Sequence, residues 1–480
     1  MKQGLTNYYQ PEYLWKIMKG EEKCGKLRKG YYSAEVEEMS KKLKRLREEC
    51  RKKGKDSRED IKMEISELRT RLDEEKQKIL HQKSRDIANG KAKIEIETKD
   101  IKGNQAYIAN NIETTLVAQI IKLELRRSYK LYPANMDMII EQIKALLDNP
   151  MPKIVIRADI KHFFESIPQQ ELIDKLGDDG YISRQTVKYL KSMLYAFNEK
   201  GHVLDGVGLP RGLAFSSHLS ELYMQPLDEK IKSIDGVYYY KRYVDDIIIV
   251  ADSLRHSRKE YWSSLTKIFD EKLKLHEDSE KKYIKVLDGN TPSACFNYLG
   301  YSFSYKMGTL SLGLSQKRFT KYIVLLDAIF EIYDKCSHYR KYKAMSMDER
   351  QETHFHKKDA LQQLFERLEI LTSNGLLSGR KNYVATGIFF SNKYLTDLEQ
   401  LYQLDEYYHR KIENFNPPNT LFSYSPENNY EYNLAKIKQK LYDLSFVKGF
   451  QERKIHKNGH FSRVLLDLQR IYNSRKLIGK

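Results

Sequence analysis

The chain has 480 residues, and 40% of them are hydrophobic, a share that is ordinary for a folded protein and argues against wholesale disorder. This length allows two or three domains, each with its own core. Lys and Arg number 84 against 66 Asp and Glu, which leaves a net charge of +18. Such a balance suits a phosphate-rich partner, and it equally fits a merely soluble basic protein.

The cysteines and the apolar runs limit the class of protein further. The four cysteines, Cys24, Cys50, Cys295 and Cys336, are far apart and show no CxxC spacing. This argues against a zinc module and against a disulfide framework. No apolar run approaches the roughly 18 residues that a membrane span needs, and the first residues show no signal-peptide pattern. We therefore expect a cytoplasmic protein that does not enter a membrane.

Residues 1–90 are expected to form a helical extension. Two segments between residues 34 and 80 carry apolar side chains in steps of three and four, as in a coiled coil. The first has Val36, Met39, Leu43, Leu46 and Cys50, and the second has Ile61, Ile65, Leu68, Leu72 and Ile79. Two helices joined by a short polar turn predict an antiparallel hairpin. Its charged faces are typical of solvated helices, and they also fit RNA docking or oligomerisation.

Residues 91–310 mix strands with helices. The segments KIVIRAD (153–159), VYYYKRY (237–243) and IIIVA (247–251) each read as a strand. The last two are separated by three residues only and predict a β-hairpin. Strands interleaved with helices favour an α+β fold. After residue 310 amphipathic helical patterns return, and we expect a helical region over residues 311–480.

The hairpin carries the sequence Tyr243-Val244-Asp245-Asp246. Two adjacent acids are electrostatically costly unless a cation neutralises them. Mg²⁺ prefers oxygen ligands. Because neighbouring side chains of an extended backbone point to opposite faces, Asp245 is the better direct ligand, and Asp246 acts directly or through water. Taken alone, this short motif also fits an ordinary acidic turn.

A third acid stands at the end of the first strand. Asp159 closes KIVIRAD and is followed by IKHFFESI. If this strand neighbours the hairpin, Asp159 and Asp245 can share two cations that stabilise an in-line phosphoryl transfer. The expected metal set is thus Asp159, Asp245 and Asp246 with two Mg²⁺ ions, Mn²⁺ being an alternative.

Between these acids lies a turn-forming loop, GLPRGLAFSS (208–217), followed by a helical pattern. Its glycines would let the backbone approach a base or a phosphate closely. A single loop of this kind is more often structural.

In this order and spacing the three elements resemble the palm of reverse transcriptases, and bacterial members of that family in particular. The resemblance covers about residues 100–310. It implies a right-hand polymerase with fingers and a palm built on a ferredoxin-like antiparallel sheet, a helical thumb, and the helical hairpin as an extension. The helical carboxyl end looks most like abortive-infection and defence-associated enzymes.

The resemblance also implies roles for single residues. Phe164 stands where the family blocks a ribose 2′-hydroxyl, which implies selection of deoxynucleotides, with Phe163 packed beneath it. Lys281, or alternatively Lys282, matches a lysine-bearing loop after the palm. Further implied contacts are those of Gly212, Ser216 and Tyr243 with substrate and of Leu299 and Gly300 with the primer.

The expected function is therefore an RNA-directed DNA polymerase that adds dNTPs to a DNA product on an RNA template. The resemblance implies a noncoding RNA template in a bacterial antiviral defence system. Untemplated or protein-primed DNA synthesis, RNA-dependent RNA synthesis and a non-catalytic RNA-binding scaffold are the alternatives. The sequence leaves open a homo-oligomer or a partner protein.

Overall fold

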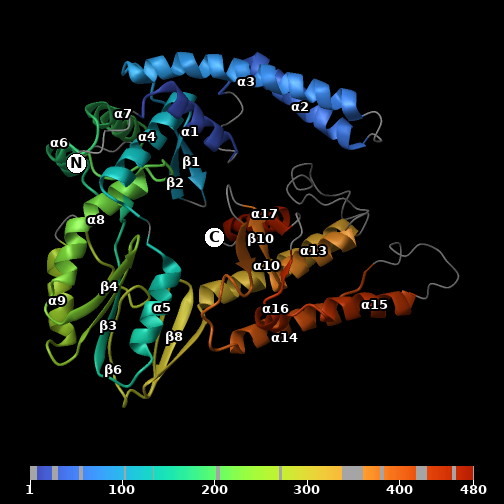
Figure 1. Cartoon of the computed structure of the whole chain (residues 1–480). Coiled ribbons are helices and arrows are strands. Elements are labelled where there is room, and N and C mark those ends of the chain that lie inside the picture. Colours follow the sequence, from blue (N-terminus) through green and yellow to red (C-terminus); the bar gives the residue numbers. More distant parts are fainter. Residues whose placement is uncertain are drawn as a thin grey trace. The chain divides into compact units, whose positions relative to one another are not determined.

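The computed structural model has mixed α+β architecture (Figure 1). It describes residues 8–23, 31–52, 58–101, 104–132, 134–201, 206–269, 273–337, 360–378, 383–417, 430–456 and 461–478. The chain divides into two compact units. The first unit comprises Met1–Ala134, Ala158–Ile247 and Lys259–Lys282, and the second comprises Asn135–Arg157, Ile248–Arg258 and Tyr283–Lys480.

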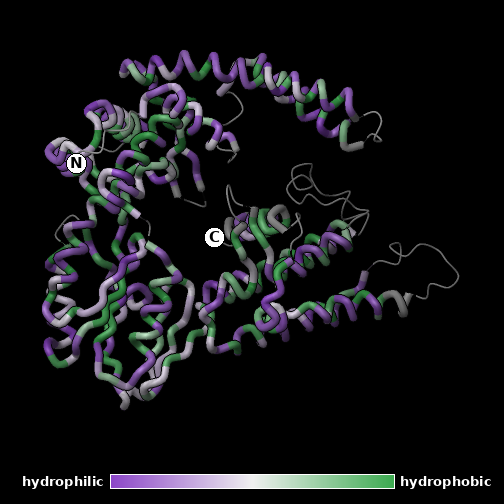
Figure 2. Tube along the Cα trace, in the orientation of Figure 1, coloured by the Kyte–Doolittle hydropathy of each residue, from purple (hydrophilic) through white to green (hydrophobic). Residues whose placement is uncertain are grey.

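The first unit begins with three helices, α1 (Pro11–Lys23), α2 (Ala34–Lys52) and α3 (Arg58–Ala88). Helices α2 and α3 pack side by side along an apolar seam (Figure 1). The seam contains buried Val36, Leu43, Leu68 and Leu72 and partly buried Tyr32, Met39, Leu46, Ile65 and Ile79. Figure 2 shows hydrophobic residues recurring at intervals along these otherwise hydrophilic helices. The predicted helical hairpin is confirmed, because one apolar stripe on each helix is enough to join them.

The rest of the first unit surrounds a nearly fully buried helix, α4 (Ile112–Ser128). The run from Ile112 to Leu125 buries polar as well as apolar side chains, and its buried acids have partners: Glu113 accepts from Lys83, and Glu124 accepts from the Ser183 amide. Asn111 begins the helix by accepting a hydrogen bond from the Thr114 amide. The other elements are β1 (Ile96–Ile101), β2 (Asn104–Ala109), α6 (Gln169–Asp179), α7 (Arg184–Gly201) and α8 (Ser216–Lys232).

A four-stranded sheet has the order β4-β5-β3-β6. The strands are β3 (Lys153–Asp159), β4 (Val237–Tyr243), β5 (Asp246–Asp252) and β6 (Tyr283–Leu287). Helices α6 to α8 separate β3 from β4, and α9 (Arg258–Ile268) separates β5 from β6. This β-α-β-β-α-β sequence and strand order are those of a ferredoxin-like sheet, as expected. The central strands β3 and β5 are almost entirely buried, which explains why both read as continuous apolar runs.

The second unit combines two small sheets with helices. Strands β7 (Ala294–Tyr298), β8 (Tyr301–Lys306) and β9 (Thr309–Leu314) form an antiparallel meander. Its helices are α5 (Met136–Leu147), α10 (Gln316–Ser337), α13 (Ala360–Thr372), α14 (Glu399–Glu413), α15 (Tyr430–Tyr442), α16 (Phe446–Glu452) and α17 (Phe461–Ile478).

The carboxyl-terminal region is not purely helical. Besides its helices it contains a three-stranded sheet of β10 (Asn374–Ser378), β11 (Tyr383–Gly387) and β12 (Ile455–His456), in the order β11-β10-β12. The sequence analysis missed this sheet, because its strands are at most five residues long and lack a clear alternation. The α+β class as a whole is confirmed.

Two earlier expectations can be compared with the described part of the chain. There, no helix is both long enough and apolar enough to cross a bilayer. Among the cysteines that the structure describes, Cys50, Cys295 and Cys336 are all free thiols.

Two helical glycines provide a matched test of packing. A Cβ at Gly177 in α6 would meet nothing within 4 Å, whereas one at Gly449 in α16 would lie 1.8 Å from the Thr372 carbonyl oxygen. Gly177→Ala should stabilise the protein by about 0.5–1 kcal/mol, because alanine loses less backbone freedom in a helix. Gly449→Ala should destabilise it by about 1–3 kcal/mol through overpacking. Thermal denaturation of both variants checks the opposite signs, and equal shifts would contradict the packing around Gly449.

Candidate active site

The end of β3 and the turn between β4 and β5 come together in the first unit. The Ile160 amide, next to Asp159, donates to the Asp245 carbonyl at 3.2 Å. Burial raises the pKa of the Asp245 carboxyl, and the nearby charges of Asp159 and Asp246 raise it further, against a smaller opposing effect of Lys281. The structure therefore gathers the three predicted acids at one place, where their like charges repel one another.

A lysine and a histidine contact the most enclosed of these acids. The Asp159 side chain is 10% exposed, and its Oδ1 lies 2.7 Å from Lys281 Nζ and 3.3 Å from His276 Nε2. The His276 amide also donates to the Asp159 carbonyl at 2.8 Å. Lys282 instead pairs with Glu277 and stacks on Trp262. Of the two candidate lysines, the structure thus places Lys281 in the site, and it adds His276, which the sequence analysis did not single out.

The fit of a divalent cation depends on the charge and chemistry of this cluster. Among the described residues, no three His, Cys, Asp or Glu side chains are already arranged to hold a metal ion. The Lys281 ammonium donates to Asp159 Oδ1 and thus takes the place that a metal cation would have at this oxygen. Carboxylate oxygens are nevertheless the ligands that Mg²⁺ prefers, and the pKa of Asp245 is raised first by burial and then by the charges of Asp159 and Asp246. The residues fit such an ion once Lys281 moves away from Asp159.

Phe164 lies beside these acids in sequence, in a short 3₁₀ turn (Phe164–Ser166). Its ring contacts the buried Phe163 edge-on, with the ring centres 5.3 Å apart, as predicted for a packing residue beneath it. On another side the Arg211 guanidinium lies 5.4 Å from the centre of the Phe164 ring. Arg211 also pairs with Glu165, with Nε 2.8 Å from Oε1 and Nη2 3.0 Å from Oε2. The Phe164 ring is therefore held by its neighbours.

The GLPRG loop joins this turn to strand β2. Its Leu209 amide donates to the Phe164 carbonyl at 2.7 Å, and its Arg211 carbonyl accepts from the Tyr107 amide at 2.6 Å. Gly212 has φ of +101°, and a Cβ there would lie 2.7 Å from the Tyr107 carbonyl oxygen. A cavity of about 320 Å³ lies alongside, lined by Gln105, Tyr107, Glu165, Phe197, Gly208 and Arg211 among others.

Two of the residues predicted to contact substrate, Ser216 and Gly212, also have partners within the protein. The Ser216 side chain is buried, and its hydroxyl donates to the Pro210 carbonyl at 2.7 Å. Gly212 is exposed, and only the direction that a Cβ would take is closed by the Tyr107 backbone. The substrate contacts of Gly212 and Ser216 therefore stay predictions. Tyr243, at the end of β4, is partly exposed.

The predicted primer contacts, Leu299 and Gly300, form the turn between β7 and β8 in the second unit. Both have positive φ, +46° and +87°. Arg318 donates from Nη2 to the Leu299 carbonyl at 3.3 Å, and any Cβ at Gly300 would overlap its guanidinium. Glycine is favoured here chiefly by its positive φ, because the end of the flexible Arg318 side chain could shift to make room for a Cβ.

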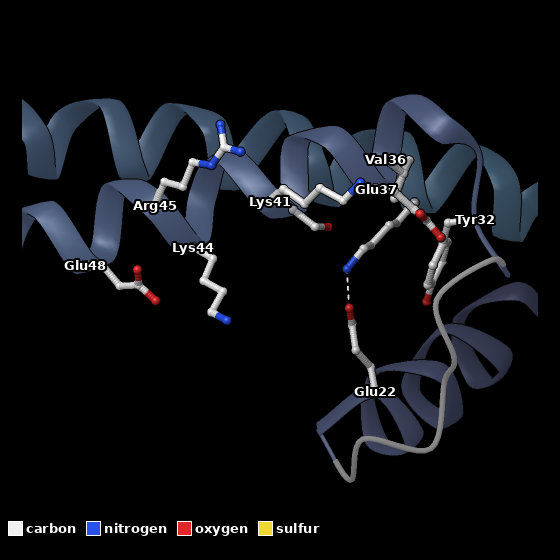
Figure 3. Close-up of a pocket in the computed structure, with 10 residues that line it drawn as sticks. Glu22, Tyr32, Val36, Glu37, Lys41, Lys44, Arg45 and Glu48 are labelled. Atoms are coloured by element: carbon white, nitrogen blue, oxygen red, sulfur yellow. Dashed lines mark hydrogen bonds and ion pairs between the residues drawn. The ribbon is translucent and has the colours of Figure 1, made fainter. Parts of the chain in front are cut away.

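A larger cavity of about 470 Å³ lies at the amino-terminal helices (Figure 3). Its lining includes the cations Lys41, Lys44, Arg45 and Lys76 and the acids Glu22, Glu37 and Glu48. Lys76 pairs with Glu22 across it. The mixed charges distinguish this cavity from the acidic cluster, and none of the predicted site residues lines it.

The raised pKa of Asp245 gives a test in the free protein. A group whose pKa is raised by folding contributes stability at low pH and loses it as pH rises through the folded value. Without divalent ions, Asp245→Asn should therefore raise the thermal midpoint at pH 7, and the gain should vanish at acidic pH, where Asp245 is protonated. Differential scanning fluorimetry in EDTA measures this, with the exposed acid Asp178 changed to Asn as the control. A thermal midpoint of Asp245→Asn below that of the wild type at pH 7 would contradict the repulsion between the acids.

Part of the chain matches a known protein family. Residues 82–303 match the family model described as reverse transcriptase (RNA-dependent DNA polymerase), and this range contains all the site residues named in the sequence analysis. No curated protein sequence matches the chain.

Similar solved structures include telomerases. One from Candida albicans, in complex with a fragment of telomeric RNA, is 14% identical and has a TM-score of 0.35, with 74% of this chain and 54% of that one covered. Two apo telomerases from Candida tropicalis are 15% and 12% identical, with TM-scores of 0.31 and 0.32. These cover 46% and 80% of this chain and 54% and 65% of theirs, so the chain spans less than two thirds of each telomerase. TM-scores this low do not establish a common fold. The family match shows a reverse transcriptase domain, described as an RNA-dependent DNA polymerase, over residues 82–303, which is less than half of the chain.

Proposed function

We propose that the protein extends DNA on an RNA template, with Asp159 and Asp245 at the reaction centre. The observation that carries this proposal is the meeting of these two acids with Lys281 and Asp246 at the end of the central strands. Two strands from distant parts of the sequence are needed to bring the acids together. Such an arrangement costs stability in the free protein and fits a site that receives cations.

Reverse transcriptase domains generally use divalent metal ions, typically Mg²⁺. In this chain Asp159 and Asp245 would hold them, with Asp246 a ligand directly or through water, and Mn²⁺ is an alternative to Mg²⁺. When bound, two such ions stabilise the charge on the attacking and leaving oxygens of an in-line displacement.

The protein's own groups prepare this site. The Lys281 ammonium must leave Asp159 Oδ1, from which it is now 2.7 Å away, before that oxygen can serve as a ligand. Because its side chain is 43% exposed, it can swing away without leaving the site. The freed ammonium would then stabilise negative charge on an incoming triphosphate.

Phe164 is proposed to select the sugar. Its ring contacts both Phe163 and Arg211, and these contacts would restrict its turning aside for a ribose 2′-hydroxyl. Steric exclusion requires this kind of immobility, because a mobile ring would admit both sugars. Deoxynucleotides are therefore the proposed substrates.

The RNA template and the biological role are proposed from the net charge and from the carboxyl-terminal helices. The net charge of +18 supports a nucleic-acid partner. The helical carboxyl end resembles that of defence-associated enzymes, and on this basis we propose a noncoding RNA as template in bacterial antiviral defence, in the cytoplasm. The charged faces of α2 and α3 suit docking of RNA, of a second copy or of a partner protein.

Primer extension with purified protein, Mg²⁺ and dNTPs tests the reaction. Asp159→Asn and Asp245→Asn should each lower the rate by roughly 10²–10³-fold or more, because charge stabilisation at the reaction centre is lost. Asp178→Asn, at an exposed acid away from the cluster, should keep the full rate. Equal rates in wild type and Asp245→Asn would reject the proposed centre.

The same assay separates the alternatives. Synthesis that needs no RNA template would indicate untemplated addition, and DNA that stays on the protein after phenol extraction would indicate protein priming. Absence of any synthesis, together with a cellular function that survives the double change of Asp245 and Asp246 to Asn, would indicate an RNA-binding scaffold.

Sugar selection has its own test. Phe164→Ala should raise the use of NTPs relative to dNTPs by roughly 10–200-fold, the range that a small steric difference in a pocket provides. The ratio of kcat/KM values for the two nucleotides measures it, and dNTP use by the same variant is the internal control. An unchanged ratio would rule out a steric role for the ring.

A further inference from the structure

The turn that carries Asp245 is strained. Val244, between β4 and β5, has φ of +59°. A β-branched residue rarely adopts this conformation, because its Cβ crowds the backbone, and the cost is about 1–3 kcal/mol. Such a conformation persists only where the surrounding structure enforces it. The neighbours of Val244 must therefore supply the constraint.

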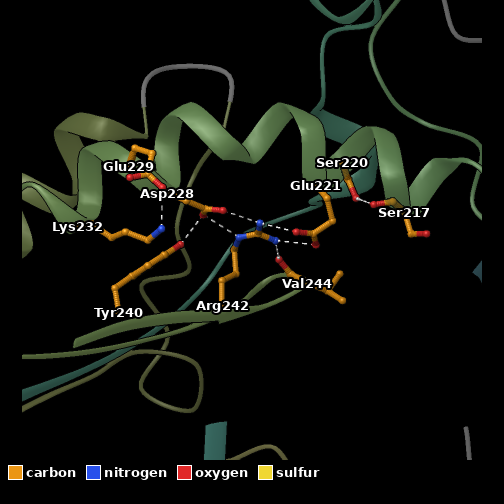
Figure 4. A network of polar contacts seen from close by, with 9 residues as sticks. All are labelled: Ser217, Ser220, Glu221, Asp228, Glu229, Lys232, Tyr240, Arg242 and Val244. Atoms are coloured by element: carbon orange, nitrogen blue, oxygen red, sulfur yellow. Dashed lines mark hydrogen bonds and ion pairs between the residues drawn. The ribbon is translucent and has the colours of Figure 1, made fainter. Parts of the chain in front are cut away.

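Arg242 supplies this constraint from inside the protein (Figure 4). Its side chain is 4% exposed. Its Nη1 donates to the Val244 carbonyl at 2.7 Å. The other four N–H groups donate to carboxylates on α8: Nη1 and Nη2 to Glu221 at 3.1 and 2.9 Å, and Nε and Nη2 to Asp228 at 3.0 and 2.8 Å. All five donors of the guanidinium are thus used, and one of them fixes the strained turn.

The charge of Arg242 is secure in this position. Burial disfavours the charged guanidinium, but hydrogen bonds and charges from Asp228 and Glu221 outweigh it and raise the pKa of Arg242 above its ordinary value. The Tyr240 hydroxyl donates to Asp228 Oδ1 at 2.6 Å and orients that carboxylate. Arg242 therefore keeps its charge at any pH at which the protein is folded.

The backbone is held on both sides of the Asp245 Cα. Arg242 binds the carbonyl of Val244, which precedes Asp245, and the Ile160 amide binds the carbonyl of Asp245 itself at 3.2 Å. Because both carbonyl oxygens are fixed, the direction of the Asp245 Cα–Cβ bond is fixed as well. This keeps it beside Asp159 despite the repulsion between the two charges.

We propose that Arg242 is a positioning residue for polymerisation: it holds the left-handed Val244 turn so that the Asp245 carboxylate stays beside Asp159. The role of Asp245 in this statement rests on the proposed function. A lysine could neutralise the same acids, but its single ammonium cannot serve both carboxylates and the turn carbonyl as a planar fork does.

The first experiment separates positioning from simple stabilisation. Arg242→Lys should lower kcat for dNTP addition by roughly 10–100-fold, with the KM for dNTP nearly unchanged, because the reaction centre is misplaced while the nucleotide still binds. The control is Arg367→Lys, at a buried arginine that pairs with Asp467 in the second unit. It should lower the thermal midpoint and leave kcat intact. If Arg242→Lys also lowers only the midpoint, Arg242 merely clamps α8 to β4, and the proposal is overturned.

A second variant relieves the strain itself. Glycine adopts positive φ without penalty, so Val244→Gly should raise kcat when combined with Arg242→Lys and should not raise it when Arg242 is intact. If Arg242→Lys fails to fold, Arg242→Gln with Asp228→Asn replaces it, because the cluster of Arg242, Glu221 and Asp228 then keeps its formal charge of −1. Failure of glycine to raise kcat in the Arg242→Lys background would count against the proposal.

A spectroscopic readout makes the proposal independent of activity. In valine-labelled free protein, the Val244 methyl resonances, assigned with Val244→Ile, should shift or broaden in Arg242→Lys and stay in place in Arg367→Lys. Unchanged resonances would overturn the role of Arg242 even if the wild type proves inactive. Inactive wild type with shifted resonances would instead reject only the proposed function.

Discussion

The crowding of negative charge at the end of the central strands is the constraint on which the rest of the site depends. Asp159 and Asp245 are brought together by the strand order, and burial with mutual repulsion raises the pKa of Asp245. The neighbourhood compensates this charge, since Lys281 and His276 contact Asp159. A fold that keeps such repulsion is less stable than it would be with one of the charges removed. The same constraint explains why the acids need a rigid backbone.

Two arginines restrain the backbone, one at the turn between β4 and β5 and one at the turn between β7 and β8. Val244 and Leu299 are both non-glycine residues with positive φ, and each has its carbonyl bound by an arginine, Arg242 and Arg318 respectively. A planar guanidinium can satisfy carboxylates or amides and still donate to a turn. In each unit, a costly backbone conformation is thus stabilised by a hydrogen bond from an arginine side chain.

The sequence predicted the elements with strong periodicity and missed those without it. The predicted bounds of the strands 153–159 and 237–243 match the structure. Both segments are rich in β-branched or aromatic residues and are flanked by charged ones. The sheet of β10, β11 and β12 was missed, since strands of five residues or fewer leave no periodic signal. Phe163 was predicted to pack beneath Phe164 and does so, while Ser216 was assigned to substrate and is buried.

By itself, the sequence determined the α+β class, the helical hairpin and the identity of the acids, because these depend on local patterns and on motif order. Only the tertiary structure decided which groups surround the acids. His276, Arg211 and Arg242 are ordinary residues in the sequence, and their parts come from contacts with residues such as Asp159, Phe164 and Val244. The physical reason is that charge compensation and backbone strain arise between side chains that only folding brings together. Asp159, Asp245 and Asp246 could be named in advance, but what holds them could not.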